Sequence, residues 1–385
     1  MTEDHEGFLY PQVDSEACID CGLCEKVCPA INQGNPILPL TTYAARNNDE
    51  NIRYKSSSGG IFTLLAEQII GDGGVVFGAK FDERWNVVHS YTECIEGLEM
   101  FRGSKYVQSS IGDNYKYAKQ FLLAGRKVLF SGTPCQIAGL KNFLQKEYEN
   151  LLTVEVVCHG VPSPRVWRDY LKYRATKYVP GEKSDSLLLK ESPMIIDISF
   201  RDKSNGWEKY GFKISYAVSE EARNTDSKSV FTAEEEVAPF TEDLFMKGFL
   251  KNLYLRPSCY QCAFKQGKSG ADISIADYWG IQRVHPELDD DGGVNLVLIN
   301  TTVGEGYFSL VRGRLTYTVS DYQEAIVNNP SIVKSEKEPS QRTLFWKKYE
   351  GQGVVCIDGI CQSMAPSKLR ILVGKVVRKL KFEVK

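Results

Sequence analysis

The chain has 385 residues, of which 25 % are charged and 42 % are hydrophobic, and its formal net charge at pH 7 is −2. This length allows two domains with a substantial core, and the balanced charge gives no bulk electrostatic reason to expect a nucleic acid or an acidic membrane as partner. No apolar run approaches the roughly 20 residues of a membrane span, and the acidic N-terminus, MTEDHEGFLYP, is unlike a signal peptide. We therefore expect a cytoplasmic protein with no membrane span and no nucleic-acid partner.

Eleven cysteines in such a chain need a role other than disulfide bonding, because cytosolic thiols stay reduced. Burial in a core accounts for Cys94, Cys356 and Cys361. It does not account for the two clusters, a run of four cysteines at 18–28 and a CxxC pair at 259–262. Their spacing is typical of metal ligands.

The N-terminal run reads CIDCGLCEKVCP, which is the C-x2-C-x2-C-x3-C-P spacing of bacterial ferredoxins. Thiolates suit iron–sulfur centres, and Gly22 eases the tight turn around the metal. A zinc site would more often show two separated CxxC pairs. The run predicts a [4Fe–4S] module with the ligands Cys18, Cys21, Cys24 and Cys28.

The fourth cysteine of this run leaves two alternatives open. In two-cluster ferredoxins it ligates the other cluster, yet no second run follows here. Either one cluster takes all four local cysteines, or an upstream run is missing and Cys28 serves that second cluster.

After a proline-containing linker, NQGNPILPL, the chain alternates between strand and helix patterns. This alternation favours an α/β layer that includes parallel strands. In chain order we expect a strand at 41–46, a helix at 56–70, a hairpin from 73–81 and 86–92, a helix at 114–125, a strand at 126–132, a helix at 133–144 and a strand at 151–158.

The second half of the chain mixes helix and antiparallel patterns. We expect a helix at 163–176, an antiparallel pair around Asn205–Gly206, a loop or weak strands at 217–237, an amphipathic helix at 240–255 and strands at 271–280 and 294–301. The last forty residues are basic and weakly patterned.

Two single cysteines lie at the ends of neighbouring predicted strands. Cys135 follows the strand at 126–132, and Cys158 ends the next one. Parallel strands place their carboxyl ends together, where open α/β sheets bind cofactors, so the CxxC of Cys259 and Cys262 would complete four thiolates there. Two alternatives stay open. The single cysteines could be unrelated buried thiols, with the CxxC supplying half of a zinc site, or His159 could replace one thiolate as a ligand.

Three loops rich in glycine and hydroxyl groups precede or join predicted elements. SSSGGIF at 56–62 begins a helix, where exposed amides favour phosphate, although ordinary N-capping by Ser57 or Ser58 explains the serines equally well. The other two are RGSKYVQSS at 102–110 and SGTPCQIAG at 131–139. The loops suit a dinucleotide, but no GxGxxG fingerprint exists, which disfavours a standard NAD site.

Taken together, these motifs resemble the coenzyme F420 hydrogenase/dehydrogenase beta-subunit family. The segments that carry the resemblance are CIDCGLCEKVCP, SSSGGIFTLLAE, GSKYVQSS, FSGTPCQIAGLK, VVCHGVPSP, FRDKSNGW and CYQCAFK with ADISIADYWGI. The resemblance implies an α+β or α/β fold, with a small ferredoxin-like N-terminal module and a mixed α/β flavin-binding domain. The implied domains are 1–40 for the ferredoxin-type module, which the second alternative makes half of a two-cluster ferredoxin, 41–300 for the FAD and [4Fe–4S] domain, and 301–385 for a C-terminal extension of unknown role.

The resemblance also implies cofactors and residues. Cys135, Cys158, Cys259 and Cys262 become ligands of an internal [4Fe–4S] cluster, so that the chain holds one or two clusters together with FAD. Lys105 and Tyr106 are the candidates for substrate contact or electrostatic tuning. The implied FAD contacts are Ser58, Gly59, Gly60, Ser104, Lys105, Tyr106, Gln108, Gly132, Thr133 and Gln136.

The function implied is that of an oxidoreductase that passes electrons between the ferredoxin-type cluster, the internal cluster and FAD. Hydride exchange would follow with a small organic acceptor, either the deazaflavin coenzyme F420 or another molecule. The expected partner is a redox protein or ferredoxin. The alternatives are a non-catalytic electron-transfer subunit of a larger complex and a structural zinc protein.

Overall fold

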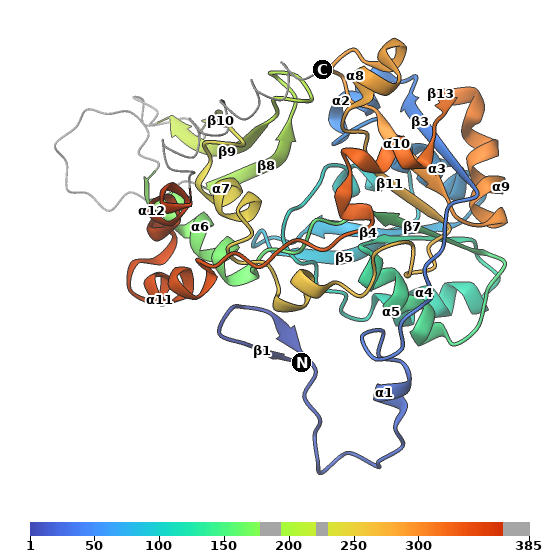
Figure 1. The fold of residues 1–385 in the computed structure, drawn as a ribbon, viewed down its shortest axis with the longest axis horizontal. Coiled ribbons are helices and arrows are strands. Elements are labelled where there is room, and N and C mark those ends of the chain that lie inside the picture. Colours follow the sequence, from blue (N-terminus) through green and yellow to red (C-terminus); the bar gives the residue numbers. More distant parts are fainter. Residues whose placement is uncertain (178–193, 221–229, 365–385) are drawn as a thin grey trace, which may run out of the picture.

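The computed structural model describes residues 1–177, 194–220 and 230–364. Its centre is a mixed sheet of eight strands in the order β13-β3-β12-β11-β7-β6-β4-β5 (Figure 1). The neighbours β4, β6, β7 and β11 run parallel, and the remaining pairs are antiparallel. The strands are β3 (Thr41–Asn47), β4 (Val75–Phe81), β5 (Val87–Thr92), β6 (Val128–Gly132), β7 (Leu151–Val156), β11 (Ile273–Asp277), β12 (Asn295–Ile299) and β13 (Leu315–Val319). The expected mixed α/β architecture is confirmed.

Helices cover both faces of this sheet, and the alternation of side chains along each strand explains why. Val76 of β4 and Leu129 of β6 face a core that they share with α3 (Ile61–Gly71) and α9 (Thr302–Val311). Their neighbours Phe77 and Phe130 face the opposite side, under α4 (Asn114–Leu123) and α5 (Pro134–Leu144). Strands with apolar residues on both faces are those that a two-sided layer of helices requires.

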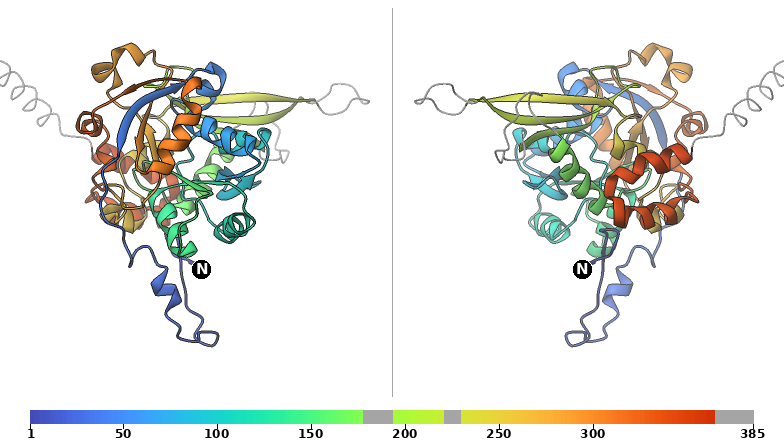
Figure 2. Two further views of the ribbon diagram at one scale, coloured as in Figure 1. Left: turned by 90° about the vertical axis from the view of Figure 1, so that its right-hand side faces the viewer. Right: turned by 90° about the vertical axis from the view of Figure 1, so that its left-hand side faces the viewer.

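A second sheet projects from the body (Figure 2). It contains β8 (Met194–Asp202), β9 (Gly211–Glu220) and β10 (Val230–Pro239), all antiparallel. Residues 217–237 were expected as a loop or weak strands. The strand alternative holds for the described part, since β10 pairs with β9 over ten residues and this backbone pairing stabilises a strand with an acidic centre, Glu234–Glu236. Residues 221–229 of that prediction lie outside the described residues.

An aromatic core joins the second sheet to the helices beside it. Phe200 and Phe212 of the sheet pack on Trp167, Phe200 also packs on Phe245, and the same core includes Phe345. The helices that carry Trp167, Phe245 and Phe345 are α6 (Pro164–Lys177), α7 (Leu244–Leu250) and α11 (Arg342–Gln352), and α12 (Cys356–Ser363) packs against α7.

Residues 315–363 therefore belong to the main body, since β13 pairs with β3 and α11 and α12 contribute to this core. The domain boundaries at 40 and 300 stay predictions. The shorter elements are α2 (Glu50–Lys55), α8 (Ile281–Val284), α10 (Tyr322–Val327), η1 (Glu96–Phe101), η2 (Pro257–Gln261), η3 (Pro286–Leu288), η4 (Arg312–Arg314), η5 (Pro330–Ile332) and η6 (Gly353–Val355).

The three cysteines that were expected in a core divide into two groups. Cys356 and Cys361 of α12 are buried in the aromatic core, as expected. The expectation is wrong for Cys94, which is exposed, because it follows β5 in the turn before η1 and not within a strand or helix.

The N-terminal segment begins with a small hairpin of β1 (Thr2–Glu3) and β2 (Leu9–Tyr10) and then forms an arm that projects from the body and carries α1 (Leu23–Lys26) (Figures 1 and 2). The hairpin is held to the body, because Glu6 forms an ion pair with Arg342 and its carbonyl accepts from Ser163. In the described ranges, we find no helix with both the length and the apolar character needed to cross a membrane.

Candidate functional site

Cys135 and Cys158 lie at the same edge of the central sheet. Cys135 is in the first turn of α5, directly after β6, and Cys158 follows β7 by two residues. The two strands are parallel neighbours, so their carboxyl ends meet. A capping box fixes the first loop, since Gln136 accepts from the Thr133 amide at 3.0 Å and Thr133 caps α5. The Thr133 hydroxyl lies 3.2 Å from the Cys135 sulfur.

The CxxC loop packs against the segment that follows Cys158. The Arg256 amide donates to the Val161 carbonyl at 2.9 Å, and Leu255 pairs with Pro162 in an antiparallel bridge. A Cβ added to Gly160 would lie 3.4 Å from the Cys259 Cβ. These contacts bring together the segments of Cys158 and Cys259, which are far apart in sequence.

The four thiols also interact electrostatically. Burial raises the pKa of the Cys158 thiol well above its ordinary value, and Cys259, Cys135 and Cys262 each raise it further. Burial raises the pKa of Cys259 to about 11, with contributions from Cys135 and Cys262, and burial likewise raises the pKa of Cys135. Thiols that disfavour one another's ionisation, as Cys135, Cys158 and Cys259 do, become thiolates together most readily around a cationic centre.

The four thiols are not arranged as the site of a single metal ion. Across the described residues, no group of three or more His, Cys, Asp or Glu side chains has the arrangement to hold one metal ion. A [4Fe–4S] cluster separates its four thiolates more widely than one zinc ion does, because each thiolate binds a different iron. The four cysteines therefore remain the predicted ligands of an internal cluster.

Hydrogen bonds fix the same loops, and one of them favours anionic sulfur. Burial raises the pKa of Cys259, but a backbone hydrogen bond with Val161 opposes this effect. The Cys262 amide donates to Ser335 at 2.9 Å, and the Lys265 ammonium donates to the Cys158 carbonyl at 2.6 Å. Such contacts orient thiolate ligands and tune a cluster.

The N-terminal cysteines lie on the projecting arm. Cys18, Cys21 and Cys24 are exposed and Cys28 is half-buried. Gly22, with φ at +66°, precedes α1 and supplies the left-handed turn that the run needs. The ligand assignment of Cys28 stays open between the two alternatives.

Beside Cys158 a cavity of about 620 Å³ opens between the central sheet and the second sheet, a size typical of cofactor and substrate sites. Eight of the ten predicted FAD contacts line it: Ser58, Gly60, Ser104, Lys105, Tyr106, Gly132, Thr133 and Gln136. The other two do not. Gly59 packs so tightly that an added Cβ would lie 2.6 Å from the Ala45 carbonyl, and Gln108 accepts from Arg256 at 3.0 Å.

The N-terminus of α3 faces this cavity without a side-chain cap. Capping by Ser57 or Ser58, one of the two expectations, is wrong: the N-cap is Gly60, with φ at +81°. Ser58 instead donates to the Val294 carbonyl at 2.8 Å, and Ser57 accepts from the Ser104 amide at 2.6 Å. Within the described ranges, the one side chain that accepts from an amide of this helix end is Asn295, from Ile61 at 3.3 Å, so the helix end keeps the character of an anion site.

Lys203 fixes that helix entrance from the second sheet. Its buried ammonium donates to the carbonyls of Arg53, Ser58 and Gly292, each at 2.9 Å. Lys203 belongs to the FRDK segment at the end of β8, so the second sheet positions the glycine loop of the central sheet.

Both candidate catalytic residues line the cavity. The Lys105 ammonium donates to the carbonyls of Arg102 and Gly103 at 2.9 and 3.2 Å, and burial lowers its pKa to about 7. The Tyr106 ring stacks on Phe249, with 5.1 Å between centroids. Lys105 is thus a cation whose charge depends on pH near neutrality.

Sequence reasoning missed Arg201 and His89 as cavity residues. Arg201 forms an ion pair with Asp277 at 2.9 Å and lies 3.9 Å from the Tyr210 ring centroid, while its buried Nε has no hydrogen-bond partner. Burial lowers the pKa of His89 to about 4, and its ring nitrogens contact the Ser109 hydroxyl at 2.6 Å and the Ser131 carbonyl at 3.0 Å. The FRDK and ADYW segments were recognisable, but nothing local showed that their side chains meet in one cavity.

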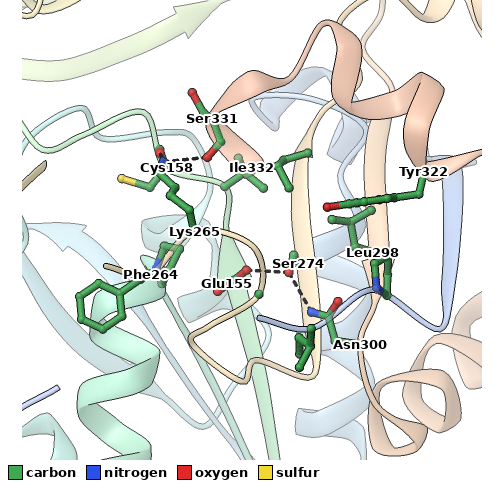
Figure 3. A pocket seen from close by; sticks show the side chains of 15 residues that line it. Glu155, Cys158, Phe264, Lys265, Ser274, Leu298, Asn300, Tyr322, Ser331 and Ile332 are labelled. Carbon is green, nitrogen blue, oxygen red and sulfur yellow. Dashed lines mark hydrogen bonds between the residues drawn. The ribbon is translucent and has the colours of Figure 1, made fainter. Parts of the chain in front are cut away.

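A second, much smaller cavity of about 20 Å³ lies beneath Cys158 (Figure 3). The buried Glu155 carboxyl accepts there from Ser269 and, at 2.7 Å, from Ser274, which in turn accepts from Asn300. Burial raises the pKa of Glu155. This volume suffices for about one water molecule, so the polar network supports the edge of the sheet and is not a substrate site.

Comparisons with known proteins agree with this architecture. The sequence model of the C-terminal part of the beta subunit in the coenzyme F420 hydrogenase/dehydrogenase family matches residues 125–324, just over half of the chain. A second model, described as a 4Fe-4S binding domain, matches residues 10–33 and confirms the predicted 4Fe-4S module. No curated protein sequence matches the chain significantly.

Among solved structures, a chain of the F420-reducing [NiFe] hydrogenase complex from Methanosarcina barkeri, in a xenon derivative, is similar. The identity is 17 %, the TM-score is 0.48, and the match covers 83 % of this chain and 96 % of that chain. Likeness at this level contributes nothing to the assignment of a function.

Proposed function

The chain belongs to the coenzyme F420 hydrogenase/dehydrogenase beta-subunit family, and on that premise we propose that it is an iron–sulfur flavoprotein oxidoreductase. One observation carries the proposal. The cavity that unites eight predicted flavin contacts is also lined by Cys158, one of four electrostatically coupled cysteines. A site for a two-electron organic cofactor and a site for a one-electron centre therefore share a wall.

The residues present fit FAD. The uncapped end of α3, with Arg102 and Lys105 beside it, offers amides and cations to a pyrophosphate, while Tyr106, Tyr210 and Trp279 offer ring faces. Arg201, whose Nε is unpartnered, adds a hydrogen-bond donor close to those rings.

The residues also fit an internal cluster. Cys135, Cys158, Cys259 and Cys262 would hold it, and the Val161 backbone would stabilise negative charge on sulfur. When bound, FAD supplies hydride chemistry and a [4Fe–4S] cluster supplies single-electron transfer. The chain orients the two groups, excludes water from them, and holds a proton or positive charge at the Lys105 Nζ.

The acceptor is a small organic molecule, either coenzyme F420 or another, and the N-terminal module receives electrons from a redox partner protein. The exposure of Cys18, Cys21 and Cys24 supports that partner, because electron exchange between proteins requires a centre near the surface. A non-catalytic electron-transfer subunit would carry clusters without reducing an acceptor by itself.

The test is anaerobic purification followed by measurement of flavin, iron and sulfide in the full chain. We expect bound FAD that an organic acceptor reoxidises in the isolated protein. A preparation with clusters but no flavin, even after reconstitution with FAD, would leave only the electron-transfer role. Absence of iron and sulfide would contradict both roles.

A further inference from the structure

Arg256 stands where three parts of the molecule meet. It immediately precedes η2, three residues before Cys259, and its carbonyl accepts from the Cys259 amide at 2.8 Å. Its guanidinium donates to the Gln108 side chain at 3.0 Å and to the Leu9 carbonyl at 3.0 Å. One side chain therefore joins the CxxC loop, the cavity loop at 102–110 and the N-terminal hairpin.

The charge of Arg256 is not neutralised by an acid. Across the described residues, no carboxylate forms an ion pair with it, whereas Arg53, Arg201 and Arg342 are each paired with at least one, Asp290, Asp277 and Glu6 respectively. The contacts of Arg256 are neutral oxygens and the ring faces of Tyr10, at 4.2 Å, and Phe8, at 5.5 Å. It presents a net positive charge to its surroundings.

The backbone geometry places that positive charge at the CxxC loop. Arg256 is the N-cap of η2, and its carbonyl accepts from the Cys259 amide at 2.8 Å while Gln108 and Leu9 fix its guanidinium. In keeping with this position, Arg256 favours the thiolates of Cys259 and Cys135, although burial raises the pKa of both.

The N-terminal hairpin in turn holds this loop from a second side. Glu6 pairs with Arg342, whose guanidinium also donates to the Tyr260 hydroxyl at 3.2 Å, and Tyr260 lies between the two cysteines of the CxxC. Residues 6–10 thus contact the CxxC loop through two arginines: Arg342, whose charge Glu6 neutralises, and Arg256, whose charge has no carboxylate partner among the described residues.

We propose that Arg256 is a positioning residue that raises the reduction potential of the internal cluster and ties the N-terminal hairpin to the CxxC loop. The inference rests on the internal cluster of the proposed function. A cluster held by four thiolates is anionic and gains a further negative charge on reduction, so a fixed, uncompensated cation beside it stabilises the reduced form more than the oxidised form.

The experiment compares Arg256→Gln with Arg256→Lys and with Arg84→Gln, an exposed arginine in the turn between β4 and β5. All are made in the full chain with Cys21→Ser, which removes a ligand of the N-terminal cluster so that the internal cluster alone reports. The readout is the midpoint potential from a titration followed by electron paramagnetic resonance, with iron content measured in each sample.

We expect Arg256→Gln to shift the midpoint to a more negative potential at unchanged iron content. Arg256→Lys should keep the potential close to that of the parent, because it keeps the charge, and Arg84→Gln should leave it unchanged. An unshifted midpoint in Arg256→Gln, or an equal shift in the lysine variant, would overturn the proposal. If the parent holds no internal cluster, the proposed function and this inference both fail.

Limited proteolysis of the N-terminal segment gives the second readout. Lysine cannot donate to Leu9 and Gln108 with the planar fork of arginine, so cleavage within residues 1–35 should be faster in both Arg256 variants than in Arg84→Gln. Unchanged cleavage in both would overturn the link between the hairpin and the loop.

Discussion

Lys105 is a cavity cation whose charge is set by its surroundings. Its ammonium meets two backbone carbonyls and the Phe81 ring, 5.9 Å from the ring centroid, and burial lowers its pKa to about 7. The charged form therefore predominates below this pKa and is lost as the pH rises through it. A lysine with an ordinary pKa near 10.4 would show no change in this range.

The first prediction is that acceptor reduction declines as the pH rises through about 7, because the Lys105 charge that attracts the acceptor or stabilises reduced flavin disappears. Lys105→Arg should remove this decline, since arginine stays protonated, and Lys105→Met should be slow at every pH. The measurement is kcat/KM across the range from about two pH units below this pKa to about two above it. An identical decline in the arginine variant would show that another group titrates.

Folding stability gives the same lysine a second signature with a defined sign. The unfolded chain binds this proton more tightly than the folded chain, so the contribution of Lys105 to the free energy of unfolding increases as the pH rises from about 7 toward its ordinary value near 10. Denaturant melts of Lys105→Met should lack that part of the increase. Parallel pH dependence in the variant and the parent would contradict the shifted pKa.

For single residues, the sequence predicted a role wherever the residue type has few chemical roles in proteins. A ferredoxin spacing limits the chemistry of cysteine, so the N-terminal 4Fe-4S module could be predicted, whereas the internal cluster stays a prediction. Arg201, His89 and Arg256 could not, because arginine and histidine have many roles, and theirs arise from contacts with Asp277, Ser109 and Leu9.

The glycine loop before α3 is the element on which the flavin proposal depends most. Gly59 has no room for a side chain, since an added Cβ would lie 2.6 Å from the Ala45 carbonyl and 2.8 Å from the Asn295 amide nitrogen. Both neighbours are backbone atoms of paired strands, so moving them would break strand pairing and cost free energy. Gly71, at the other end of the same helix, has open space around it.

Gly59→Ala should therefore displace the loop and lower the flavin content of purified protein several-fold, while its iron content persists. Gly71→Ala should leave both contents unchanged, because alanine is well tolerated in a helix. Flavin and iron are measured in the same preparations. Equal flavin in the two variants would mean that the loop does not contact the cofactor.

The link between β8 and this loop is equally open to test. Lys203→Met removes a donor from three carbonyls, of which that of Arg53 still accepts from the Ser56 amide, so we expect a loss of about 2 kcal/mol in the free energy of unfolding. The exposed Lys209→Met should cost less than about 0.5 kcal/mol. Urea denaturation checks both, and an equal midpoint would contradict the anchoring role of Lys203.

Most strands and helices followed from periodicity, because two-sided burial imposes apolar runs on β6, β7 and β12. Tertiary contacts decided the rest. Pairing with β9 decided between the loop and the strand for β10, and the serines before α3 bind Val294 and Ser104 and do not cap the helix.

At the scale of the whole molecule, segments that are distant in sequence meet at one edge of the central sheet. The carboxyl ends of β6 and β7, the CxxC loop and the second sheet meet around one cavity, and the N-terminal hairpin contacts the same loop. The fold class could be predicted from the alternation of elements. The integration of residues 302–363 into the body could not, because their pattern is weak and their partners lie in β3 and α7.

The central claim is that four cysteines from three distant segments hold one cluster. The most direct measurement is the iron content of anaerobically purified wild-type protein, Cys158→Ser and, as the matched control, the exposed Cys94→Ser. The account predicts about eight irons per chain for the wild type and for Cys94→Ser, and about four for Cys158→Ser, since the N-terminal cluster remains. The same iron content in Cys158→Ser as in the wild type would contradict it.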